Sequence, residues 1–125
     1  MLVFAGRERG DDASRIDRYL ILPRRELDAG RSRVLNLRGA ELLKRKKLDA
    51  AFEDFARARE LDKDNQAAIY NQARAAARLN DRANLLNALG ALKKEPGLRR
   101  RIDEEPDFSS FRQDEEFKKR VRGVE

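Results

Sequence analysis

The chain has 125 residues, with 29 Lys and Arg against 23 Asp and Glu, which gives a formal net charge of +6. This length fits a single domain, and a charged fraction of 42% confines the apolar residues to narrow helical stripes. Because the chain has no cysteine and no histidine, it has no disulfide, thiol nucleophile, imidazole base or zinc site built on those residues. We expect neither a cofactor nor a metal.

Residues 1–31 form the least regular part of the sequence. The apolar run at residues 2–5 is too short for a signal peptide or a membrane span, so we expect a cytoplasmic protein with no membrane-spanning segment. Ser14-Arg15-Ile16-Asp17 fits a capping box, and the helical face that follows is interrupted at Pro23. We favour a half-repeat helix that stacks on the next helix; the alternatives are a flexible arm and a segment that pairs with a second copy.

Residues 32–65 predict two helices joined by a short turn. Ser32 is a typical capping residue, so the first helix is expected to run from there to about Arg45. The second helix begins near Asp49 and carries one continuous apolar stripe. Its members recur at helical spacing: Leu48, Ala51, Phe52, Phe55 and Ala58.

Residues 66–97 predict a second helix pair. Asn65 is placed to cap a third helix, which runs from Gln66 to about Asn80 and is rich in alanine, a residue that favours helix and allows close packing. A fourth helix is expected from about Arg82 to Lys94, and Pro96-Gly97 ends the pair.

The two pairs superimpose when the sequence is shifted by thirty-four residues. Small or apolar residues then coincide in six pairs: Leu35 with Ile69, Gly39 with Ala73, Leu42 with Ala76, Ala51 with Leu85, Phe55 with Leu89, and Ala58 with Leu92. Such a period is typical of helical solenoids, which generally serve as interaction scaffolds.

On these residues, segments 32–65 and 66–97 resemble two tetratricopeptide repeats. The first copy keeps Gly39, Ala51, Phe55 and Ala58 at the family's small-large-small spacing, and Arg-Glu-Leu-Asp follows at residues 59–62. The resemblance implies an all-α fold in which antiparallel helix pairs stack as a short right-handed solenoid. An ordinary antiparallel helix bundle with the same stripes is the alternative.

The sequence also departs from the family pattern at several positions. Leu35 stands in place of the usual aromatic residue, Leu42 in place of Tyr, Arg38 in place of Leu and Lys63 in place of Pro, while Leu85 and Leu92 replace Ala.

Residues 98–125 place three phenylalanines among charged residues. This stretch resembles the terminal segment that follows tetratricopeptide arrays in many bacterial proteins, and Asp107 and Asp114 can each start a short helical turn. We expect a helical cap that covers the fourth helix with Leu98, Ile102, Phe108, Phe111, Phe117 and Val121.

In this family the first helix of each repeat lines a concave groove. The resemblance therefore implies a binding groove formed by Arg33, Asn36, Lys44, Tyr70, Asn71, Arg74 and Arg78. Arginine forks bind carboxylates, while Tyr70 and Asn71 would add a flat apolar contact and a backbone-binding amide. We thus expect a non-catalytic adaptor that binds an acidic peptide or protein surface; a merely solvated helix face is the alternative interpretation.

Other functions are less well supported by the sequence. Self-assembly through helices left uncovered at the N-terminal edge is second, and nucleic-acid binding is third, because most basic clusters have acidic residues nearby. The arginines at 99–101, for example, precede acidic residues at 103–105, and the cluster at 118–122 follows acidic residues at 114–116. The sequence has no phosphate loop, metal-ligand spacing or serine elbow, so we do not expect an enzyme.

Overall fold

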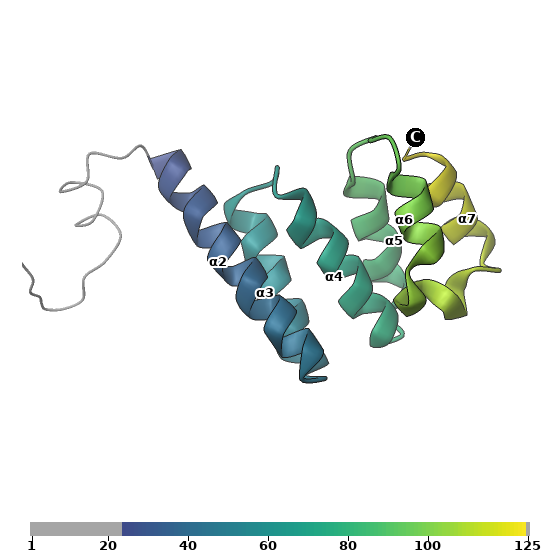
Figure 1. Cartoon of the computed structure of the whole chain (residues 1–125), viewed down its shortest axis with the longest axis horizontal. Coiled ribbons are helices and arrows are strands. Elements are labelled where there is room, and N and C mark those ends of the chain that lie inside the picture. Colours follow the sequence, from purple (N-terminus) through teal and green to yellow (C-terminus); the bar gives the residue numbers. More distant parts are fainter. Residues whose placement is uncertain (1–23, 125) are drawn as a thin grey trace, which may run out of the picture.

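The computed structural model describes residues 24–124, and every regular element in that range is a helix (Figure 1). The elements in chain order are α2 (Arg24–Lys44), α3 (Leu48–Leu61), α4 (Gln66–Arg78), α5 (Arg82–Ala91), α6 (Leu98–Glu104), the 3-10 helix η1 (Pro106–Phe111) and α7 (Glu115–Arg122). None of these helices is long and apolar enough to cross a membrane.

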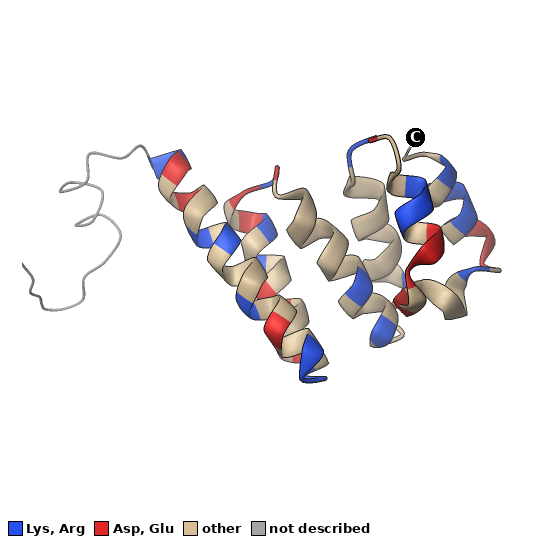
Figure 2. Cartoon of the chain, in the orientation of Figure 1, with Lys and Arg blue, Asp and Glu red and all other residues tan. Residues whose placement is uncertain are grey.

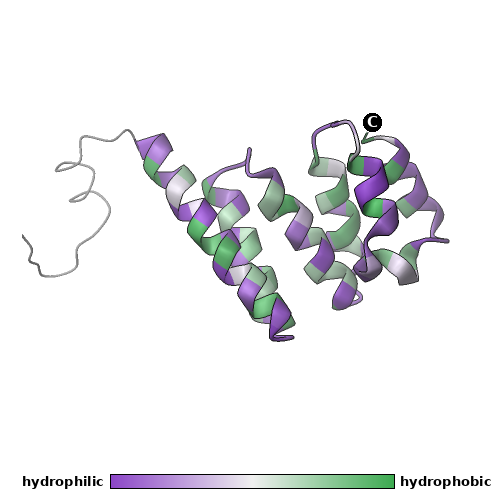
Figure 3. Ribbon diagram, viewed as in Figure 1, coloured by the Kyte–Doolittle hydropathy of each residue, from purple (hydrophilic) through white to green (hydrophobic). Residues whose placement is uncertain are grey.

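Successive helices lie next to one another along the long axis of the molecule (Figure 1). The helix α2 packs on α3, and α4 contacts α2, α3, α5 and η1, while α7 contacts α5 and α6. The helix α5 is largely hydrophobic, whereas α6 and α7 carry many hydrophilic residues (Figure 3). The fold of the described residues is therefore all-α, as predicted.

The first helix begins at Arg24, so the prediction that Ser32 caps it is wrong. Ser32 instead lies inside α2 and is fully buried, where its hydroxyl donates to the Ala58 carbonyl at 2.6 Å and accepts from the Asn65 amide at 2.8 Å. Ser32 thus joins three successive helices. The predicted boundary between residues 31 and 32 falls inside α2, and the predictions for residues 1–23 lie outside the described residues.

The fourth helix is shorter than predicted, because α5 ends at Ala91 rather than Lys94. Leu92 already has an extended backbone, and the Lys93 backbone N–H donates to the Gln66 side chain at 2.8 Å. This contact turns the chain away from the helix axis before Pro96.

The close packing of α2 on α3 depends on Gly39. The Phe55 ring is fully buried against this glycine, and a Cβ atom built on Gly39 would lie 2.6 Å from the ring. Thirty-four residues later, Ala73 and Leu89 take the corresponding positions, and both are buried. The small position and the large position of the repeat are therefore buried in both helix pairs.

The helix α4 is the most covered element in the described part of the chain. Eight of its residues are buried: Ala68, Ile69, Tyr70, Gln72, Ala73, Ala75, Ala76 and Ala77. The predicted cap is confirmed, because the Asn65 side chain accepts the Ala68 backbone N–H at 3.1 Å. Alanine keeps the helix narrow, so that neighbours can approach from several sides.

The C-terminal elements cover α4 and α5 with the six predicted apolar residues, all of which are buried. The Phe108 ring lies 5.9 Å from the Tyr70 ring and 5.7 Å from the Phe117 ring. Asp114 caps α7 as predicted, but Asp107 lies inside η1, whose cap is Glu105. The Glu105 carboxylate accepts the Asp107 backbone N–H, which leaves the Asp107 carboxylate available for another contact.

We predict opposite effects of alanine at two glycines of α2. Gly39→Ala should lower the free energy of unfolding by about 1–2 kcal/mol, because overpacking against the buried Phe55 ring outweighs the higher helix propensity of alanine. Gly30→Ala should raise the free energy of unfolding by about 0.5–1 kcal/mol, because only Arg33 lies near the new methyl group, at 3.8 Å. Urea denaturation measures both changes. No gain from Gly30→Ala would contradict a helix that extends to Arg24.

We also predict an acid-dependent contribution from the Arg82–Asp114 ion pair. Hydrogen bonding from Arg82, which lies 2.6 Å away, lowers the pKa of Asp114 from 3.8 to about 2. A carboxyl group with a lowered folded-state pKa stabilises the fold above its unfolded pKa, and this stability is lost as the pH falls from about 4 to about 2. The melting-temperature difference between wild type and Arg82→Ala should shrink over that range. Arg57→Ala, an exposed change on α3, provides the control.

Candidate functional site

The predicted groove residues fall into two groups in the structure. We call all seven, Arg33, Asn36, Lys44, Tyr70, Asn71, Arg74 and Arg78, the first-helix face, because they lie on α2 and α4. Five of them contact one another or the C-terminal segment, whereas Arg33 and Lys44 remain exposed. The two groups offer different chemistry.

An amide pair links the two helices of the first-helix face. The Asn71 side-chain amide donates to the Oδ1 atom of Asn36 at 3.0 Å, and the Oδ1 atom of Asn71 accepts from Arg74 at 3.3 Å. The structure therefore brings together three of the residues that the sequence predicted for the groove. Their mutual bonds satisfy part of the donor and acceptor capacity that a peptide backbone would otherwise use.

The two arginines of α4 hold acidic residues from the C-terminal segment. The Arg74 guanidinium lies 3.0 Å from the Asp107 carboxylate and 3.4 Å from the Glu105 carboxylate. Arg78 lies 3.9 Å from Asp107 and also donates to the Leu43 carbonyl at 3.3 Å. Positive residues in the second half of α4 thus lie beside negative ones at the connection of α6 to η1 (Figure 2).

Tyr70 does not offer the exposed aromatic surface that we expected from the sequence. Its side chain is only 8% exposed, with Phe108 at its edge and the Arg101 guanidinium 4.7 Å above its ring. Burial, and then the charge of Glu105, raise the pKa of Tyr70. Tyr70 is a packing residue beneath the C-terminal segment, and it is not available as a flat contact for a ligand.

The remaining cations of the face are accessible. The Lys44 side chain is 80% exposed and has only a long contact of 3.9 Å with Glu41. Arg33 is also exposed and forms no hydrogen bond or ion pair with any residue that the structure describes. These two side chains supply the uncompensated positive charge of the first-helix face.

A shallow cavity of about 370 Å³ lies beside the paired arginines. It extends from α4 to the start of η1 and is lined by Tyr70, Asn71, Arg74, Arg101, Glu104, Glu105 and Pro106. Its charges are balanced, with two arginines and two glutamates. An acidic ligand in this cavity would therefore compete with Glu105 for the Arg74 side chain.

The ion pairs that neutralise this region were not predicted from the sequence. Glu105 and Asp107 are about thirty residues from Arg74 along the chain, so no local pattern indicates the contact. A second missed pair joins Arg38 to the buried Asp54 through two hydrogen bonds of 2.7 and 2.8 Å. One signal was available: Arg38 stands where tetratricopeptide repeats commonly have Leu, and a cation at a position with a packing pattern needs a partner.

The described residues contain no group of three or more acidic side chains placed to hold a metal ion. The first-helix face combines cations and amides, and two of its arginines pair with carboxylates of the C-terminal segment. Its chemistry is suited to polar recognition.

Comparison of the chain with protein-family models, with curated proteins and with solved structures finds no match.

Proposed function

We propose that this chain is a non-catalytic protein-interaction module of the tetratricopeptide type, which binds an acidic segment of another protein on its first-helix face. The thirty-four-residue repeat and the succession of packed helices support a solenoid-like arrangement. In such an arrangement α2 and α4 present neighbouring surfaces, and the amide pair of Asn36 and Asn71 lies where they meet.

One observation carries the proposal. The chain's own acidic segment, Glu105-Pro106-Asp107, lies on Arg74 and Arg78, with its closest carboxylate 3.0 Å from Arg74. These contacts are charge-assisted and partly buried, which strengthens them relative to exposed ion pairs. That Arg74 and Arg78 already hold carboxylates supports the binding of an acidic segment on this face.

An acidic partner would add contacts that the internal segment does not make. Arg33 and Lys44 on α2 are exposed cations, and the internal acidic residues contact α4. A partner segment laid along the face would pair with Arg33 and Lys44 and would replace Glu105 or Asp107 on α4. The internal carboxylates thus lower the affinity for the partner by competing with it.

The test uses hexaglutamate as a probe, with binding followed through the amide NMR signals of α2 and α4. Arg33→Gln/Lys44→Gln should weaken binding about fivefold, because it removes two accessible cations, each worth about 0.5 kcal/mol in an exposed pair. Glu105→Gln/Asp107→Asn should strengthen binding severalfold, because the competing charges are removed while the amide oxygens that accept hydrogen bonds are kept.

The matched control is Lys63→Gln/Lys94→Gln, which removes the same charge from exposed positions away from the face. Equal weakening by the control would show that only net charge attracts the probe. An unchanged affinity in Glu105→Gln/Asp107→Asn, with an unchanged melting profile, would rule out competition on α4.

A second candidate function, self-assembly, is favoured by one specific observation. Val34 and Leu37 are the exposed large hydrophobic residues of the described chain, at 65% and 69% exposure. They lie on α2 near a cavity of about 670 Å³ to which Leu27, Leu35 and Leu61 contribute. The corresponding positions on α4 are Ala68, which is fully buried, and Asn71, which contacts α2. On α2 the side chains of Val34 and Leu37 stay exposed, so a second copy of the chain can pack against them.

Self-assembly predicts a concentration-dependent mass. Leu37→Asp should shift the association equilibrium toward monomer, because the charge would be buried at the contact, and it should leave the folded monomer intact, because the side chain is exposed. Sedimentation equilibrium over a wide range of protein concentration measures the effect, with Lys63→Asp as a control. A wild-type chain that remains monomeric at all concentrations would exclude this function.

A further inference from the structure

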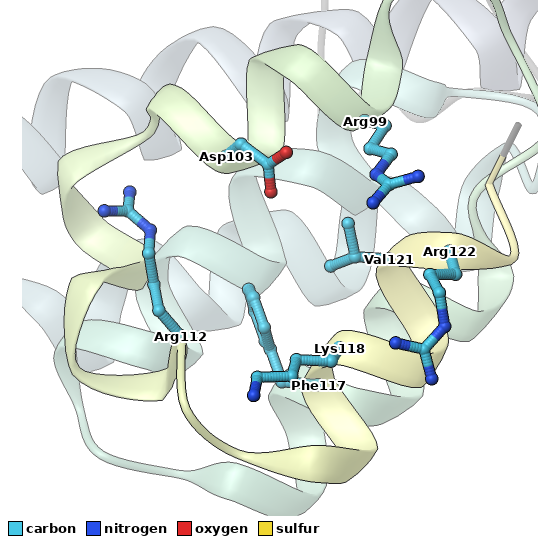
Figure 4. Close-up of a pocket in the computed structure, with 7 residues that line it drawn as sticks. All are labelled: Arg99, Asp103, Arg112, Phe117, Lys118, Val121 and Arg122. Carbon is cyan, nitrogen blue, oxygen red and sulfur yellow. The ribbon is translucent and has the colours of Figure 1, made fainter.

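A small basic pocket lies between α6 and α7, at the C-terminal end of the molecule (Figure 4). Its volume is about 190 Å³, and Phe117 and Val121, which are 3% and 4% exposed, supply its apolar lining. The polar side chains around it come from three elements or their ends: Arg99, Asp103, Arg112, Lys118 and Arg122. The charged lining of the pocket thus consists of four cations and one carboxylate.

The acidic residues that are close in sequence do not neutralise this pocket. Three of them make ion pairs outside the pocket: Glu104 with Arg100 at 3.0 Å, Glu105 with Arg74 at 3.4 Å, and Asp114 with Arg82 at 2.6 Å. A fourth, Glu115, pairs with Lys118 of the pocket at 3.3 Å. Only Asp103 of the two acidic runs lines the cavity. The charge balance suggested by the sequence is thus not present in space.

The cations of the pocket are mostly uncompensated. Arg99 and Arg122 form no hydrogen bond or ion pair with any described residue, and the Glu115 partner of Lys118 is 83% exposed, where an ion pair contributes little. Arg112 is held in place by its bond to the Glu105 carbonyl at 2.7 Å. Its buried Nε–H has no acceptor among the described residues. One fixed guanidinium and three accessible cations thus line the same small cavity.

We propose that this pocket binds a carboxylate side chain of an acidic protein segment. Arginine side chains bind carboxylates through paired hydrogen bonds, and the apolar lining suits the methylene groups of Glu or Asp. A nucleic acid fits less well, because the aromatic ring of the pocket is buried and offers no face for base stacking. No residue of α2 or α4 lines the pocket, so the proposal stands independently of the first-helix face.

Hexaglutamate titrations of the full chain, followed through the amide NMR signals of α6 and α7, test this site separately. Arg99→Gln/Arg122→Gln should weaken binding at these signals about tenfold, which corresponds to about 1.4 kcal/mol. Asp103→Asn should strengthen it about threefold, because the single competing carboxylate is removed. Because one variant should weaken binding and the other should strengthen it, a general loss of folding would not explain both results.

Two control variants remove the same charge elsewhere. Arg57→Gln/Lys63→Gln changes exposed residues outside the pocket, and Arg33→Gln/Lys44→Gln changes the first-helix face; neither should alter the signals of α6 and α7 more than slightly. Equal weakening by Arg57→Gln/Lys63→Gln, or no gain from Asp103→Asn, would overturn the proposal. So would shifts in α6 and α7 caused by a single-stranded oligonucleotide but not by hexaglutamate, which would identify the site as one for phosphate.

Discussion

The packing of α4 is the constraint on which the rest of this structure depends. Small residues such as Ala73 and Ala76 keep this helix narrow, so α2, α3, α5 and η1 can all contact it. Burial against α2, α3 and α5 leaves Arg74 and Arg78 on the stripe that η1 contacts, where Asp107 pairs with both arginines. The position of the candidate binding face is therefore a consequence of how the core is filled.

The distribution of acidic residues decides where positive charge remains available. The chain has six more Lys and Arg residues than Asp and Glu residues. When a carboxylate pairs with one cation, it is therefore not available to another. Glu105 and Asp107 neutralise the arginines of α4, which leaves the cations around the pocket of α6 and α7 largely unpaired. Neutralising the arginines of α4 and leaving the cations of the C-terminal pocket unpaired are thus two results of the same pairing.

The sequence was most informative where local chemistry alone decides the structure. The helices α3 and α4, the Asn65 cap and the six buried residues of the C-terminal segment follow from helical spacing and from capping rules. Ser32 misled the prediction, because the same hydroxyl that caps helices can also bond to another helix, and local sequence does not separate the two uses. The burial of Tyr70 and the pairing of Arg74 depend on residues about thirty positions away, which a repeat pattern does not reveal.

The most extensive helix contacts of this chain, α2 with α3, α3 with α4 and α4 with α5, link consecutive helices. This pattern has a consequence for the dynamics of the chain. Opening can begin at α2 while α5 keeps its contacts with α4 and α7, because α2 packs mainly on α3 and α4. The amide protons of α4, which is covered by four other elements, should exchange with solvent last. Those in the first two turns of α2, where three successive residues at the helix start are exposed, should exchange first.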